Sequence, residues 1–163
     1  MALKSDRNEV QTDISFFMNE TATRGGVVSM STGGSGAAMD QGAALATYTA
    51  ASGTRPIGIL LNDMVNLDLT RQHINQHKDE VQKGGKVTIL RKGYVVTSSL
   101  ACATAPSAGQ LAWVSLDGNI ANSGSNLLDH TGNLQVGQFL SSQDQDGYAK
   151  VEINLPNQPA PSA

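Results

Sequence analysis

Short apolar runs separated by turn residues dominate the second half of the chain. Residues 86–90 and 94–97 are two β-type runs, and Arg91-Lys92-Gly93 between them predicts a hairpin. Further on, Leu111 and Trp113 alternate with small neighbours, and Asp117-Gly118 is a strong signal for a tight turn. The runs 135–140 and 148–155 flank a second such turn at Asp146-Gly147. These patterns predict antiparallel strands.

The region from residue 25 to residue 69 contains weaker strand signals. Residues 27–30 form a short β-type run, and residues 56–61 predict a buried strand that begins at a proline. Residues 64–69 alternate with a period of two, and residues 33–36 are typical of an open loop. Alanines permit a helix over 43–51, although Thr47, Tyr48 and Thr49 favour a strand there.

The first 24 residues fit two local structures. Val10, Ile14, Phe17 and Met18 have helical spacing, whereas residues 11–17 alternate as a strand does. Either structure leaves apolar side chains on a segment too short to bury them, so we expect an arm that becomes ordered by docking. The expected organisation is an extended N-terminal arm at 1–24, a β-barrel domain with glycine-rich loops at 25–155, and a flexible tail at 156–163.

Composition agrees with an all-β chain that has modest cores. Of 163 residues, 39% are hydrophobic, 15% charged and 4% aromatic, with 17 glycines. The formal net charge of -3 argues against general nucleic-acid binding, and one cysteine excludes an internal disulfide framework. We expect neither a membrane span nor a secretory signal, because the apolar runs are far shorter than the roughly 20 residues that cross a bilayer. The predicted fold is a small antiparallel β-barrel or sandwich, of β-tulip or jelly-roll type.

Charge is distributed unevenly along the chain. Residues 1–24 carry seven charged side chains and residues 63–92 carry ten, whereas residues 93–143 carry only Asp117 and Asp129. Neutral polar stretches are usually loops. The alternative is a surface that docks on a partner, because interface cores are depleted in charge.

The strongest candidate for metal chemistry is a histidine pair. His73 and His77 would share one face of a helix, and Asp79 or Glu80 could add a carboxylate. Ile74 stands where the zinc-protease motif has its glutamate, and loose histidine pairs are frequent by chance. A solvated polar segment or a partner contact therefore explains this stretch better than a metal site.

Other chemical motifs are incomplete. Cys102 has apolar neighbours and is expected to be a buried, unreactive residue. The glycine runs at 33–36 and 84–86 lack the remainder of a phosphate loop. Asp144 and Asp146 resemble the start of a calcium loop, but a hairpin turn explains them better. We therefore assign no catalytic, cofactor-binding or metal-binding residue.

Several blocks together resemble a known family. They span residues 58–68, 71–75, 78–82, 84–88 and 92–97, with weaker pieces at 113–118, 136–137 and 146–148. Over roughly residues 25–154 the chain is similar to head decoration, or cement, proteins of tailed bacteriophages of the cyanophage and marine-phage type. The resemblance implies a non-enzymatic homotrimer, made in the host cytoplasm, that sits on the outer capsid surface at three-fold and quasi-three-fold positions. It would bind the major capsid protein after the head expands and stabilise the shell against internal DNA pressure.

Two other functions stay open at this stage. Trp113, Tyr94 and Tyr148 on a polar β scaffold suit a carbohydrate- or receptor-binding module of a head fibre. A small metal-dependent hydrolase would use His73 and His77. Under the cement hypothesis, deleting residues 2–24 is expected to leave a folded trimer that attaches weakly to the capsid, and no individual contact residue is assigned.

Overall fold

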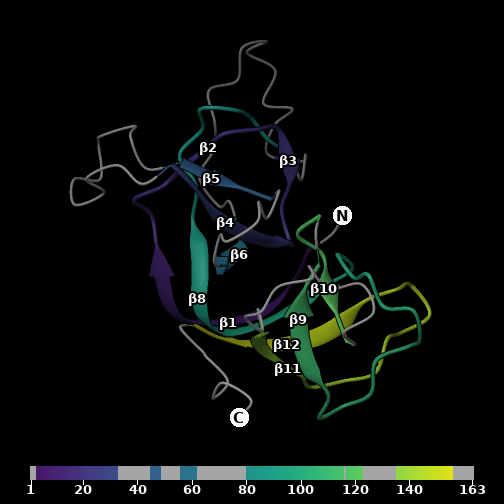
Figure 1. The fold of residues 1–163 in the computed structure, drawn as a ribbon. Helices are drawn as coiled ribbons and strands as arrows, with labels where there is room; N and C mark the ends of the chain where they lie inside the picture. The colour runs from purple at the N-terminus through teal and green to yellow at the C-terminus, as the bar shows by residue number, and fades with distance from the viewer. Residues whose placement is uncertain are drawn as a thin grey trace, which may run out of the picture.

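The computed structural model is built from β-strands, which confirms the all-β prediction. It describes residues 3–32, 45–48, 56–61, 80–115, 117–122 and 135–155. No helix occurs in these ranges. Twelve strands are present: β1 (Leu3–Asp13), β2 (Phe17–Met18), β3 (Ala22–Thr23), β4 (Val27–Thr32), β5 (Leu45–Thr47), β6 (Pro56–Leu60), β7 (Glu80–Val81), β8 (Ile89–Thr97), β9 (Leu111–Val114), β10 (Ile120–Ala121), β11 (Gln135–Phe139) and β12 (Ala149–Asn154) (Figure 1).

Ten of these strands form one open sheet. Their order is β10-β9-β11-β12-β8-β6-β4-β5-β2, with β1 also paired to β8, while β3 and β7 form a separate pair. All pairs are antiparallel except β2 with β5, which makes the sheet mixed. The end strands β10 and β2 do not pair with each other. The sheet is therefore not closed into a barrel, and of the two predicted architectures the sandwich-like one describes it.

Strand β8 is shared by the two halves of this sheet. β1 runs along one edge of β8, from Leu3 opposite Thr97 to Asp13 opposite Ile89. A strand has only two edges, so β12 and β6 must share the other. β12 pairs with residues 92–97 of β8, and β6 pairs with Ile89 and Leu90. β8 thereby joins the β9–β12 half to the β4–β6 half, and β1 covers both along its length.

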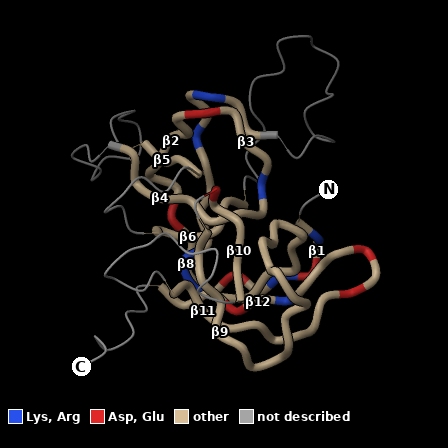
Figure 2. The backbone as a smooth tube through the Cα atoms, turned by 45° about the vertical axis from the view of Figure 1, so that its right-hand side comes forward, with Lys and Arg blue, Asp and Glu red and all other residues tan. Residues whose placement is uncertain are grey.

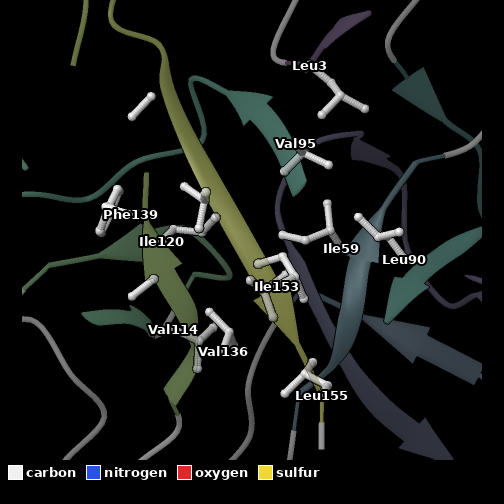
Figure 3. Close-up of a cluster of buried hydrophobic side chains, with 14 of the residues drawn as sticks. Leu3, Ile59, Leu90, Val95, Val114, Ile120, Val136, Phe139, Ile153 and Leu155 are labelled. Carbon is white, nitrogen blue, oxygen red and sulfur yellow. The ribbon is translucent and has the colours of Figure 1, made fainter. Parts of the chain in front are cut away.

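Two hydrophobic cores lie on opposite faces of β4, β6 and β8. In each of these strands one residue of an adjacent apolar pair faces the larger core and the next faces the smaller one. Val27, Ile59 and Leu90 belong to the larger core, and Val28, Leu60 and Ile89 to the smaller. Strands buried on both faces have continuous rather than alternating apolar runs, which explains the sequence 56–61. Figure 3 shows the larger core, which also includes Phe139, Ile120 and Ile153.

The predicted Asp-Gly hairpins are confirmed, whereas the hairpin predicted at 91–93 is wrong. Gly118 and Gly147 have φ values of 82° and 86°, as tight turns require, and β9 pairs with β10 and β11 with β12. Residues 89–97, however, form the single strand β8. Gly93 has a φ of 139° within it. The glycine that resembles a turn in the sequence instead lies where β1 approaches β8 closely, because a Cβ atom at position 93 would lie 1.9 Å from the Asn8 carbonyl oxygen.

The N-terminal segment is extended and paired within its own chain. Residues 3–13 form β1 and residues 17–18 form β2, which excludes the helical alternative for these residues. Leu3 is buried in the larger core, and Met18 and Ala22 are buried in the smaller one. The docking expected of this segment therefore takes place on β8, β5 and β7. The predicted strand at 64–69 and the tail at 156–163 lie outside the described residues.

Tyr48 connects β5 to the turn between β3 and β4. Its hydroxyl donates a hydrogen bond to the Thr23 carbonyl oxygen and accepts one from the Gly26 amide at 3.1 Å. Its own amide donates to the Glu20 carboxylate at 2.6 Å. Burial raises the pKa of the Tyr48 hydroxyl well above its usual value. The tyrosine thus pairs with one backbone group at the end of β3 and one in the turn that follows.

We predict that Tyr48→Phe lowers the free energy of unfolding by about 1–3 kcal/mol, because it removes the buried hydroxyl's hydrogen bonds to the Thr23 carbonyl and the Gly26 amide. Urea denaturation followed by circular dichroism measures this. Tyr94→Phe is the matched control, since the Tyr94 hydroxyl makes only a long 3.5 Å contact with Asp6. Equal losses in the two variants would contradict the role assigned to Tyr48.

Candidate interaction surfaces

The outward side of the β9–β11–β12–β8–β1 half carries two groups of exposed side chains. In β12, Val151 and Ile153 point into the core while Lys150 and Glu152 alternate with them. Tyr94, in β8, lies directly opposite Glu152 of β12 on one side and Asn8 of β1 on the other. The period-two geometry of strands places these side chains on one face. One part of this face is charged and aromatic, and another is uncharged.

The charged part is a Lys–Tyr–Asp cluster made of Lys4, Asp6, Tyr94, Asp144, Tyr148 and Lys150. Lys4 Nζ lies 3.2 Å from Asp144 Oδ2 and 4.2 Å from the centre of the Tyr148 ring. Lys150 Nζ lies 3.9 Å from Asp6 Oδ2 and 3.8 Å from the centre of the Tyr94 ring. Both lysines therefore bind one carboxylate and one ring face, and together they fasten the start of β1 to β12 and its preceding turn.

Hydrogen bonds within this cluster stabilise the ionised carboxylate of Asp144. The Tyr148 amide donates to Asp144 Oδ1 at 2.7 Å and the Asp146 amide at 3.0 Å. These bonds, with the nearby Lys4 ammonium, lower the pKa of Asp144. The predicted hairpin-turn role of Asp144 is confirmed, because its carboxylate caps its own turn.

The uncharged part, which we call the leucine surface, consists of residues 103–111 and 138–143. Leu111 is 45% exposed and Leu140 is 41% exposed. Leu111 lies opposite Gln138 in the β9–β11 register, so Leu140 is its diagonal neighbour on the same face. Residues 98–115 and 135–143 contain no Asp, Glu, Lys or Arg. In Figure 2 the tube at β9 is tan, whereas acidic residues are red in the loop at the right and charged residues also lie near β12.

Hydrogen bonds hold the leucine surface in a defined shape. The Gln110 side-chain oxygen accepts from the Ser107 amide at 2.9 Å and from Asn122 Nδ2 at 3.3 Å. Gln138 Nε2 donates to the Gly109 carbonyl at 2.9 Å. Backbone bonds of 2.8 Å join Gly109 and Gln110 to Phe139. The turn at 104–110 is thus attached to β11 through both main-chain and side-chain groups.

The structure places only some of the residues singled out from the sequence. His73, His77 and Asp79 lie outside the described residues, as do Gly33 to Gly36, and Glu80 forms part of β7. Cys102 is half-buried rather than fully buried, and it packs against the larger core. Burial raises the pKa of its thiol, although a backbone hydrogen bond at Asn122 opposes this.

The described ranges hold neither a metal-binding cluster nor a membrane-spanning helix. No group of three or more His, Cys, Asp or Glu side chains arranged to hold a metal ion occurs in them. They also include no helix long and apolar enough to cross a membrane.

The rings proposed for sugar binding are only partly accessible. Trp113, Tyr94 and Tyr148 are all half-buried. A lysine ammonium covers one face of each tyrosine ring. Trp113 lies on β9, whereas Tyr94 lies on β8 and Tyr148 immediately precedes β12. The three aromatics do not form a shared open platform.

Sequence reasoning missed both surfaces as assemblies of particular residues. Lys4 and Asp144 are 140 positions apart, and no local pattern relates them. For the leucine surface a signal did exist, because the charge-poor stretch 93–143 contains it. What the sequence lacked was the β9–β11 register that makes Leu111 and Leu140 neighbours.

Comparison with known protein families gives a match over most of the chain. The model of a family described as structural cement protein (E217 gp24/Pam3 gp6) matches residues 8–154. No curated protein matches the chain. The family match includes β2 to β12 and all but the first residues of β1.

Proposed function

Because the chain belongs to the structural cement protein family of bacteriophages, we propose that it binds the outer surface of the expanded head as a homotrimer and stabilises the shell against internal DNA pressure. Its partner is the major capsid protein, at three-fold and quasi-three-fold positions. The family assigns the chain a structural role at the capsid. The match over residues 8–154 is the observation that carries the proposal.

The fold supports this function physically. A cement protein has to transmit force between capsid subunits, so it needs a scaffold that resists deformation. The described strands supply this with two packed cores on opposite faces of β4, β6 and β8. Close-packed interiors have low compressibility. Several weak contacts become firm when one oligomer engages several capsid subunits at once, so each single contact surface can be small.

The carbohydrate-binding alternative has no comparable support. It required aromatic faces open to solvent, whereas Lys4 and Lys150 cover faces of Tyr148 and Tyr94. The proposed synthesis in the host cytoplasm follows from the capsid role, because heads assemble there.

The test is to mix the purified protein with expanded heads that lack decoration. We expect saturable binding, added density at three-fold and quasi-three-fold positions in electron micrographs, and retention of packaged DNA to higher temperature. Sedimentation of the free protein measures whether the trimer exists before binding. Absence of saturable binding would contradict the capsid role, and density confined to other symmetry positions would contradict the proposed placement.

A further inference from the structure

We propose that the leucine surface, residues 103–111 and 138–143, is the face by which this protein docks on the capsid, against an uncharged and partly apolar patch of the capsid protein. This inference rests on the proposed function and adds the surface and the chemistry of the contact. Leu111 and Leu140 form its apolar centre, and the exposed turn at 107–110 extends it.

The distribution of exposed apolar side chains singles out this surface. Val10, Ile14 and Met30 are the other exposed large hydrophobics among the described residues. Val10 and Ile14 lie next to the charged residues Glu9 and Asp13, and Met30 lies on β4. Single apolar residues scattered over a surface are normal. Leu111 and Leu140, in contrast, are diagonal neighbours across two paired strands. Uncharged residues surround Leu111 in its own stretch, and the charged residues Glu152, opposite Gln138, and Lys150, beside Leu140, border the surface only toward β12.

The absence of charge defines the chemistry of the partner. A charged side chain buried against Leu111 and the 103–110 turn would meet no Asp, Glu, Lys or Arg from residues 98–115 or 135–143. Charged neighbours occur only at the edge toward β12, where Glu152 lies opposite Gln138 and Lys150 lies beside Leu140. Burying an unpaired charge is far more costly than burying a hydrogen-bonded polar group. The part of the capsid protein that contacts Leu111 and the 103–110 turn must therefore also be uncharged, with polar groups that can pair with exposed serine, threonine and glutamine side chains.

The composition favours the capsid lattice over a second copy as the occupant. Interfaces of permanent homo-oligomers resemble a domain core and are strongly apolar, whereas interfaces between separately folded partners are more polar. Two half-exposed leucines among small polar residues match the second kind. Apolar contact is also non-directional. It can therefore accommodate the small differences among quasi-equivalent capsid positions better than ion pairs, which depend on exact geometry.

Hydrogen bonds also order the leucine surface before it binds. Gln110, Gln138 and Asn122 fasten the 104–110 turn to the neighbouring strands. A contact surface that is already ordered loses little conformational freedom on association. In the Lys–Tyr–Asp cluster, by comparison, the lysines are already paired with carboxylates of the same chain.

The test uses the full chain and undecorated expanded heads. We expect Leu111→Lys with Leu140→Lys to weaken head binding at least ~30-fold, because a central apolar contact is replaced by two unpaired charges. Ala108→Lys, in an exposed turn, is a second variant that does not disturb a strand and should weaken binding about 10-fold. Val10→Lys is the matched control, because Val10 is 70% exposed and lies outside the leucine surface. This variant should bind heads with an affinity within about 3-fold of wild type. Urea denaturation and sedimentation confirm that each variant keeps its fold and oligomeric state.

The outcomes separate this inference from the function on which it rests. If the wild-type chain does not bind heads, the proposed function fails and the inference fails with it. If the wild-type chain binds heads, and the double leucine variant and Ala108→Lys bind equally well, the function stands and the docking face is wrong. Dissociation of the oligomer in the lysine variants would make the surface a contact between copies and would also overturn the inference. Two results together support the docking face. The leucine-surface variants lose head binding while keeping their fold and oligomeric state, and the affinity of the wild-type chain changes less than about 3-fold when added salt screens ion pairs.

Discussion

Gly93→Ala is expected to destabilise the fold by about 4 kcal/mol, a large part of the 5–15 kcal/mol that holds a typical domain together. A Cβ atom at position 93 would lie 1.9 Å from the Asn8 carbonyl oxygen of β1. The φ of 139° at Gly93 is also unfavourable for any residue with a side chain. β8 cannot move away from β1, because β12 pairs with its other edge at the same place, with Ile153 opposite Gly93.

Urea denaturation measures this loss, and a second glycine separates its two causes. Gly84 has a φ of 80°, but a Cβ atom there meets nothing within 4 Å. Gly84→Ala is therefore expected to cost only about 1–2 kcal/mol, from backbone strain alone. If both variants lose the same stability, the close approach of β1 to β8 is not what requires glycine at position 93.

Deletion of residues 2–24 is expected to abolish cooperative folding. The deletion removes β1 from the whole length of β8, together with β2 and β3. It takes Leu3 from the larger core and Met18 and Ala22 from the smaller core. Losing one large buried side chain already costs about 2–5 kcal/mol, so the combined loss exceeds the stability of an ordinary domain. This prediction differs from the sequence-based expectation that the truncated chain stays a folded trimer, and the denaturation experiment decides between them.

The measurement is urea or thermal denaturation of the truncated chain, followed by circular dichroism. Leu3→Ala and Met18→Ala serve as graded controls, each expected to lower stability by about 2–4 kcal/mol without abolishing the transition. Val10→Ser, on an exposed side chain of the same strand, should change it by less than about 0.5 kcal/mol. A truncated protein that unfolds cooperatively near the wild-type midpoint would show that residues 2–24 are a separate arm after all.

The pairing of β1 with β8 matters for how a cement protein carries force. β1 joins both halves of the sheet along β8, and the Lys–Tyr–Asp cluster fastens its start to β12. Force applied to the leucine surface passes through β9 and β11 into β12 and then into β8, where β1 and β6 share the load. The strands of the proposed docking face and β1 thus belong to one connected sheet.

The prediction at residues 86–97 shows where local reasoning fails. Arg91-Lys92-Gly93 between two β-type runs has the composition of a hairpin turn, and nothing nearby in the sequence argues against it. The glycine is required because Asn8, 85 positions earlier, approaches the backbone there. Local turn chemistry and distant packing both select glycine, and the sequence alone does not distinguish the two.

What the sequence determined by itself was local. Asp117-Gly118 and Asp146-Gly147 produce their turns because positive φ angles suit glycine, and Pro56 begins a strand where its missing amide is tolerated. The all-β class and the charge-poor stretch followed in the same way, and the resemblance to cement proteins was confirmed by the family match. Tertiary structure decided the rest: the open sheet, the incorporation of residues 3–13 as β1, the division into two cores, and the meeting of Leu111 with Leu140. Each of these depends on which strands pair and in which register, and pairing energy is shared between residues that are far apart in the chain.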